Sequence, residues 1–184
     1  INTYVELARL QVLYGQFEEA VVNAENALLL NPRHSLAHAV KGWALGRQGE
    51  YLPAQTELEK AIEIDGTNAL AFAFQAEILS QQQIEGKGDL TTVDKAIEAS
   101  KRALELDPTF APAWAGLAAC HYTRAARGMA DPGEATAQAR ADANKARGLD
   151  DSLAESYAVL GEIEARDLDL PGAIRLLREA LARN

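Results

Sequence analysis

The sequence holds few side chains suited to covalent or redox chemistry. Its 184 residues include one cysteine, one methionine and three histidines. With Cys120 as the single cysteine, the chain cannot form an internal disulfide, so packing must hold the fold together. Such cysteine usage is typical of a reducing compartment, and we expect a cytoplasmic location.

Long apolar runs and a basic excess are also absent. No segment approaches the roughly 18 uncharged apolar residues that a membrane span needs, and the start, INTYVELARL, lacks the features of a signal peptide. Lys and Arg number 18 against 27 Asp and Glu, which gives a formal net charge of −9. Because phosphate backbones would be repelled, we do not expect nucleic acid as a partner. Without a spanning segment, we expect no membrane partner either. A basic segment of another protein would be attracted.

The sequence does contain ten amphipathic helical segments that follow one another in pairs. Glycine, asparagine, aspartate and proline punctuate them, and Thr91 with Asp94 has the spacing of a capping box. The predicted pairs are 2–14 with 18–30, 37–48 with 53–64, 70–83 with 91–106, 112–127 with 132–149, and 154–166 with 170–182.

Alanines recur at matching places in the second helix of every pair. One column contains Ala27, Ala61, Ala103, Ala146 and Ala180, and another, seven residues earlier, contains Ala20, Ala54, Ala96, Ala139 and Ala173. Seven residues are two helical turns, so both columns lie on one stripe of the helix. The first column has spacings of 34, 42, 43 and 34 residues. The pattern indicates a 34-residue repeat that is lengthened in the third and fourth copies.

The first helix of each pair carries a small residue four positions after a ring. The small residues are Ala8, Gly42, Ala76, Ala118 and Gly161, and the rings are Tyr4, His38, Phe72, Trp114 and Tyr157. We expect the small residues to admit a neighbouring helix. The rings are expected to fill the wedge between the helices.

This pattern resembles the tetratricopeptide repeat along essentially the whole chain. The resemblance implies an all-α, right-handed superhelical solenoid of antiparallel helix pairs, with repeats at 1–34, 35–68, 69–110, 111–153 and 154–184. The sequence departs from the family pattern at Lys41 and Gln75, which replace apolar residues, and at Leu168, which replaces the glycine between helices. Gly66 and Asp151 replace proline.

The last three repeats are also similar to repeat regions attached to bacterial nucleotide cyclases, serine/threonine kinases and winged-helix regulators. The aspartates of DLDL are usually followed there by tryptophan, whereas Leu168 and Leu170 follow them here. The chain begins without methionine and ends where a turn is due, so we expect it to be part of a longer bacterial protein.

The resemblance implies a binding groove on the concave wall formed by the first helices. The positions that carry over as candidate groove residues are Val5, Arg9, Val12, Ala39, Trp43, Arg47, Glu77, Ser80, Tyr122 and Glu162. Trp43 is the leading anchor, because exposed aromatic rings are enriched in binding hot spots. The alternative is that Trp43 packs on an adjacent repeat. Tyr122 could similarly be covered by the lengthened fourth pair.

Other candidate sites have simpler interpretations. The carboxylate clamp of one tetratricopeptide subclass is absent, since Val5 and Arg9 stand at its first two positions. Adjacent Cys120 and His121 point about 100° apart on a helix and lack further ligands, so we expect no metal site and no cofactor. The two long connectors, 84–90 and 128–132, are either a second binding surface or tolerated loop length.

The predicted function is a protein-interaction scaffold that binds a peptide or helical segment of a partner protein. The alternative is a regulatory or oligomerising module of a multidomain signalling enzyme or transcription regulator. The chain shows no convergent catalytic group, so we do not expect it to be an enzyme. Its oligomeric state is left open.

Overall fold

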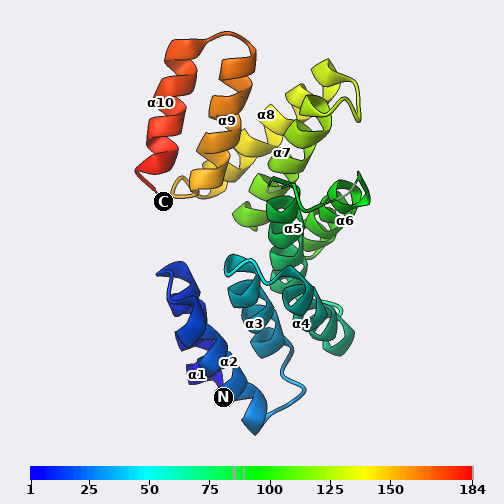
Figure 1. Ribbon diagram of the computed structural model, residues 1–184, viewed down its shortest axis with the longest axis vertical. Coiled ribbons are helices and arrows are strands. Elements are labelled where there is room, and N and C mark those ends of the chain that lie inside the picture. The colour runs from blue at the N-terminus through cyan, green and yellow to red at the C-terminus, as the bar shows by residue number, and fades with distance from the viewer. Residues whose placement is uncertain (85, 89, 184) are drawn as a thin grey trace.

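The chain folds into ten α-helices, with no strand in residues 1–84, 86–88 and 90–183, which the computed structural model describes (Figure 1). None of the helices in these residues is long and apolar enough to span a bilayer. The helices are α1 (Asn2–Leu13), α2 (Phe17–Leu30), α3 (Ser35–Arg47), α4 (Tyr51–Ile64), α5 (Ala69–Ile84), α6 (Leu90–Leu106), α7 (Ala111–Ala126), α8 (Pro132–Leu149), α9 (Ala154–Arg166) and α10 (Leu170–Leu181).

Successive helices pack in antiparallel pairs, and the pairs stack into a solenoid (Figure 1). The first helices contact each other in series, from α1 to α3, α5, α7 and α9. The second helices α2, α4, α6 and α8 each touch their own partner and the first helix of the next pair, as α2 touches α3. The first helices therefore form the inner, concave layer and the second helices the outer one, which confirms the predicted fold class.

The alanine columns lie where helices approach most closely. All ten alanines are buried, and eight of them are completely inaccessible to solvent. The small column on the first helices is equally tight, because a Cβ added to Gly42 would lie 2.8 Å from Leu58 Cγ and 2.9 Å from the Ala54 carbonyl oxygen. A Cβ added to Gly161 would likewise lie 2.8 Å from Leu177 Cγ. The small residues therefore recur because a larger side chain would not fit between the packed helices.

The lengthening of the third and fourth repeats lies mostly in their helices. α5 and α6 have 16 and 17 residues and α7 and α8 have 16 and 18, against 13 and 14 in α3 and α4. The connections within these pairs lengthen less: residues 48–50 connect α3 to α4, whereas residues 85–89 connect α5 to α6 and residues 127–131 connect α7 to α8. The predicted capping box is wrong, because α6 begins at Leu90 and Thr91 is already helical. Asp131 does cap α8 by accepting a hydrogen bond from the Glu134 amide.

The turn inside each pair requires a residue with positive φ. Gly15, Gly49, Gly86 and Gly128 supply it in the first four pairs, with φ between 65° and 81°. In the fifth pair the same place is taken by Leu168, with φ of 65° and a side chain that is 83% exposed. A leucine gains little from such exposure and strains the backbone there.

Replacing Leu168 by glycine is therefore expected to raise the free energy of unfolding by about 1 kcal/mol. Chemical denaturation followed by circular dichroism measures the change. Leu168→Ala is the matched control, because it removes the exposed side chain but keeps the Cβ that causes the strain. Equal stability of the two variants would contradict a backbone origin.

The ring column is only partly covered. His38 and Tyr157 are buried, whereas Phe72 and Trp114 are half-buried. Tyr4 was expected to fill a wedge, but it is 40% exposed, because no repeat in the structure packs in front of α1. The wedge exists only where two repeats meet.

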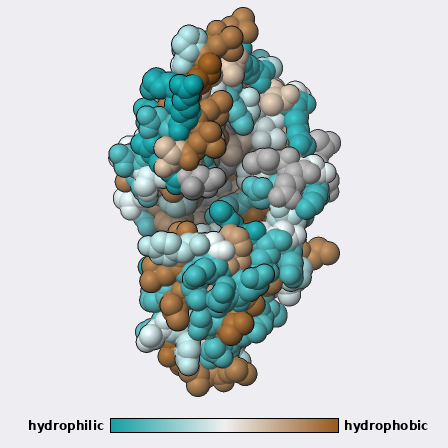
Figure 2. Space-filling view, turned by 60° about the vertical axis from the view of Figure 1, so that its left-hand side comes forward, coloured by the Kyte–Doolittle hydropathy of each residue, from teal (hydrophilic) through white to brown (hydrophobic). Residues whose placement is uncertain are grey.

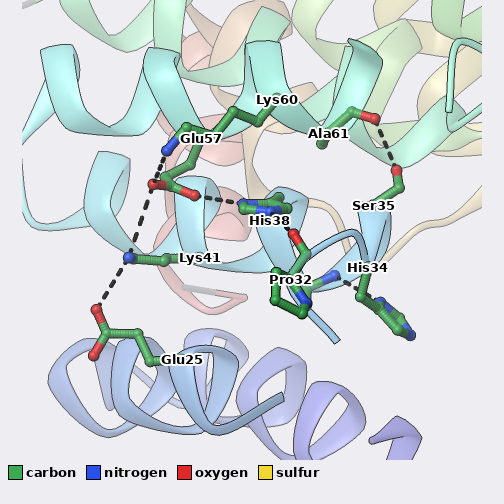
Figure 3. A network of polar contacts seen from close by, with 10 residues as sticks. Glu25, Pro32, His34, Ser35, His38, Lys41, Glu57, Lys60 and Ala61 are labelled. Atoms are coloured by element: carbon green, nitrogen blue, oxygen red, sulfur yellow. Dashed lines mark hydrogen bonds and ion pairs between the residues drawn. The ribbon is translucent and has the colours of Figure 1, made fainter. Parts of the chain in front are cut away.

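A buried polar network explains the departure at Lys41 (Figure 3). Lys41 Nζ lies 3.0 Å from the Glu25 carboxylate in α2 and 3.8 Å from that of Glu57 in α4. Glu57 also contacts His38 Nδ1 at 2.6 Å and Lys60 Nζ at 3.0 Å. Burial alone would raise the pKa of Glu57, but these partners outweigh it and hold that pKa below its ordinary value. The polar residue replaces apolar packing with ion pairs between the first two repeats.

Candidate functional site

The concave side of the solenoid contains a hollow between the second, third and fifth repeats. The chain curves so that the start of α9 faces the turn between α3 and α4 (Figure 1). The end of α3, the middle of α5 and the start of α9 form its walls. Its lining residues are Phe17, Gly46, Arg47, Gln48, Gly49, Tyr51, Glu77, Ile78, Gln81, Lys87 and Glu155.

Glu77 stands in this hollow on a support made by Trp43. The indole of Trp43 stacks on Phe74 of the next repeat, with ring centroids 4.4 Å apart and planes 3° from parallel. Its Nε1–H donates to both carboxylate oxygens of Glu77, at 3.1 and 3.0 Å. Arg47 Nη1 approaches the same carboxylate at 3.3 Å. One side of the acid is thus fixed, while a third of its side chain stays exposed.

The electrostatic environment leaves the Glu77 charge incompletely compensated. Burial in the concave wall raises the pKa of Glu77, and the Trp43 and Arg47 contacts do not reverse this shift. Repulsion from Glu155 across the hollow acts in the same direction. A cation placed between these carboxylates would lower the pKa of Glu77 and be bound in return.

The structure changes the role of Trp43. Only 8% of the residue is exposed, because the ring is enclosed between α3 and α5. The alternative interpretation is thus the observed one: Trp43 packs on an adjacent repeat. It orients Glu77 and offers a ligand almost no surface.

Four other candidate groove residues are buried. Val5, Val12 and Ala39 have exposures of 1%, 3% and 0% and belong to the core of the first two repeats. Their small or branched side chains fit between neighbouring first helices, so the assignment to a ligand-contacting surface is wrong for them. Ser80 is 9% exposed and hydrogen-bonds Cys120 in the next repeat.

The remaining candidates are accessible. Arg47 and Glu77 come together in the hollow, whereas Arg9 pairs with Glu6 on its own helix at 2.9 Å. Tyr122 is half-buried and its hydroxyl donates to the Glu162 carbonyl oxygen at 3.5 Å. Burial raises the pKa of the Glu162 carboxyl. Glu162 of α9 is thus a second acidic position among the first helices.

Sequence reasoning missed three further residues that reach the hollow. Glu155 comes from the first turn of α9, and Phe17 and Tyr51 come from the starts of α2 and α4. Lys87 lies over the Tyr51 ring at 5.1 Å, and Arg47 lies over Phe17 at 5.8 Å. Only the curvature of the stacked repeats brings them together, and no local pattern in the sequence encodes it.

The pair Cys120 and His121 has a structural role. Burial raises the pKa of the Cys120 thiol to about 12, which makes it a poor nucleophile and metal ligand. His121 is buried and its Nδ1 lies 2.8 Å from an Asp142 carboxylate oxygen in α8. Across the described part of the chain, His, Cys, Asp and Glu form no group that could hold a metal ion.

A second hollow lies on the outer side, where α4 and α6 flank α5. Polar side chains dominate its lining, among them Gln55, Glu59, Gln75 and Arg102. Gln55 and Gln82 bridge it with a hydrogen bond of 2.9 Å. Acidic and basic groups both line it.

Comparison with known proteins agrees with this architecture. The tetratricopeptide repeat model matches residues 37–68, and no curated protein matches the chain. A thermophilic TPR protein of Thermus thermophilus is 19% identical, with a TM-score of 0.76 over 99% of this chain and 90% of that one. PilF of Pseudomonas aeruginosa is 18% identical, with a TM-score of 0.70 over 100% of this chain and 76% of that one.

One further structure bears a title that mentions binding. YrrB, described as a TPR protein with an unusual peptide-binding site, is 21% identical, with a TM-score of 0.55 over 98% of this chain and 84% of that one. At these identities the likeness concerns the fold. The chain therefore carries a tetratricopeptide repeat at residues 37–68 and has the fold of tetratricopeptide-repeat proteins along its whole length.

Proposed function

We propose that the chain is a scaffold that binds a segment of a partner protein on its concave side, with a lysine or arginine of that segment placed between Glu77 and Glu155. The observation that carries the proposal is the Glu77 carboxylate, which Trp43 holds in a concave wall where burial disfavours its charge. A cationic side chain would offset that cost. The hollow also offers the partly buried ring of Phe17 as an apolar contact for its stem.

The charge of the chain supports the same choice of ligand. The formal net charge of −9 attracts basic segments over long distances and repels nucleic acid. No described Lys or Arg lies within ion-pair distance of Glu155 or Glu162, so both carboxylates are available to a ligand. Arg47 lines the hollow and would favour segments that also carry an acid or a free carboxylate.

The proposal assigns no catalysis, cofactor or membrane role to the chain. It includes a cytoplasmic location, in which Cys120 persists as the free thiol seen here. It also keeps the repeat boundaries 1–34, 35–68, 69–110, 111–153 and 154–184 as units of one domain. The alternative of a regulatory module within a larger protein stays a prediction.

Selection of phage-displayed random dodecapeptides on the immobilised chain tests the proposal. We expect enrichment of peptides that contain lysine or arginine, and we expect a synthetic peptide of the selected sequence to bind the Glu77→Gln variant at least tenfold more weakly. Because Gln still accepts a hydrogen bond from Trp43 and no longer buries a charge, this variant should be no less stable than the parent at neutral pH. Glu59→Gln, on the outer hollow, is the matched control and should bind normally.

The pH dependence gives an independent check. Because the pKa of Glu77 is raised, binding should weaken as pH falls through a range above the ordinary pKa of glutamate, and Glu77→Gln should lose this dependence. Selection of peptides without basic residues, or full binding by Glu77→Gln, would contradict the proposal.

A further inference from the structure

The Glu77 carboxylate has most of its acceptor positions already filled. Each oxygen of a carboxylate offers two lone pairs, so the group can accept about four hydrogen bonds. Trp43 Nε1 lies 3.1 Å from Oε1 and 3.0 Å from Oε2, and Arg47 Nη1 lies 3.3 Å from Oε1. No other donor among residues 1–84, 86–88 and 90–183 reaches this carboxylate. The position that stays open is therefore on Oε2.

The Trp43 N–H occupies the place that an arginine would use. Because Nε1 is almost equally close to the two oxygens, its proton points between them. A guanidinium makes its strongest contact with a carboxylate through two parallel N–H groups, one on each oxygen, and it then lies on the same bisector. The indole is held there by its stack on Phe74. An arginine of a ligand is left with a single contact to Glu77.

An ammonium group suits the position that stays open. It is a compact charge with three N–H donors, and it needs only one of them for Oε2 of Glu77. A second donor can turn toward Glu155, which lines the same hollow. In Figure 2 the surface is recessed where the lower, N-terminal half of the molecule meets the upper half, and hydrophilic side chains are visible in the recess. The third donor can thus stay in contact with water.

A guanidinium is matched less well by the same surroundings. With one N–H on Glu77, four of its five donors would still need acceptors. Glu155 could accept two of them, but it is exposed in the first turn of α9, where water weakens an ion pair. The geometry thus favours an ammonium over a guanidinium at Glu77.

We infer that the basic residue bound beside Glu77 is a lysine, and that the Trp43 N–H discriminates against arginine. This inference rests on the proposed function and narrows its ligand from any basic side chain to an alkylammonium group. Trp43 is a positioning residue here. It offers a ligand almost no surface, yet it determines which acceptor position of Glu77 stays open.

Isothermal titration calorimetry at neutral pH tests the inference. The probe is the dodecapeptide selected on the parent chain, synthesised with lysine, arginine or norleucine at the basic position on which its binding depends. An acetylated N-terminus prevents the terminal amine from replacing the side chain. We expect the lysine form to bind about fivefold more tightly than the arginine form and about tenfold more tightly than the norleucine form.

Two variants test the cause of this preference. Trp43→Phe keeps a ring but removes the N–H, so an arginine can place both of its donors on Glu77, and the advantage of lysine should fall below about twofold. Arg47→Met is the matched control, because it removes the other donor to Glu77 and leaves the place between the two oxygens occupied. The full advantage of lysine should persist in this variant. Circular dichroism checks that both variants keep their helices.

The outcomes separate this inference from the function on which it rests. If the arginine form binds the parent as tightly as the lysine form, while the norleucine form binds weakly, the inference is wrong and the proposed function stands. This comparison needs only the parent chain and holds even if Trp43→Phe does not fold. An undiminished preference for lysine in a folded Trp43→Phe chain would also overturn the inference. Equal binding of the norleucine and lysine forms would overturn the proposed function together with the inference.

Discussion

Replacement of Trp43 by alanine is expected to lower the free energy of unfolding by about 3 to 5 kcal/mol, among the largest effects of any single change in this chain. The ring is 8% exposed and stacks on Phe74 of the next repeat, so its loss opens a cavity at the junction of α3 and α5. The change also removes the donor that holds both oxygens of Glu77. Chemical denaturation followed by circular dichroism measures the effect.

Two comparisons separate the causes of this loss. Trp43→Phe keeps a ring for the stack but removes the hydrogen bonds to Glu77, and it should cost about 1 to 3 kcal/mol. Trp114→Ala should cost less than Trp43→Ala, because Trp114 is only half-buried and its Nε1 donates to the exposed Pro108 carbonyl oxygen. Equal losses for the two tryptophans would mean that Trp43 is not enclosed as described.

The second large effect is expected for Leu58→Ala, at about 2 to 5 kcal/mol. Leu58 is completely buried and lies against Gly42, the glycine at which a Cβ would come within 2.8 Å of Leu58 Cγ. Because glycine has no side chain to move into the space, the cavity cannot close by local rearrangement. The same denaturation experiment measures this loss.

Leu177→Ala is the matched control for Leu58→Ala. Leu177 occupies the equivalent position and has the equivalent glycine neighbour, Gly161, but it is 38% exposed because, among the described helices, only α9 packs against α10. Leu177→Ala should therefore cost clearly less than Leu58→Ala. A loss as large as that of Leu58→Ala would contradict the exposure of Leu177.

The fold was predictable because the stacking of helices leaves a periodic record in the sequence. Ala27 and its four equivalents must be small wherever two helices meet, so their spacing reveals both the repeat and its lengthened copies. Whether the extra residues of the third and fourth repeats lie in helices or in loops was harder to predict. Thr91 with Asp94 imitates a helix start, yet the additional residues extend α5 and α6 instead of lengthening mainly the loop between them.

The candidate site was only partly predictable. Arg47 and Glu77 were identified from register, since exposed first-helix positions face the concave side. Register cannot tell a position that faces the groove from one pressed against the neighbouring first helix, which is why Val5, Val12 and Ala39 were misplaced. Glu155 could not be found at all, because it reaches Glu77 through the curvature accumulated over three repeats.

Binding of a partner segment on the concave wall, beside Glu77, can be mapped from amide chemical-shift changes by nuclear magnetic resonance while a selected basic dodecapeptide is added to the chain. We predict the largest changes around Arg47, Glu77 and Glu155, with little change at Glu59 and Arg102 in the outer hollow. Changes confined to α4 and α6, or to the exposed faces of α1 and α10, would contradict binding at this wall.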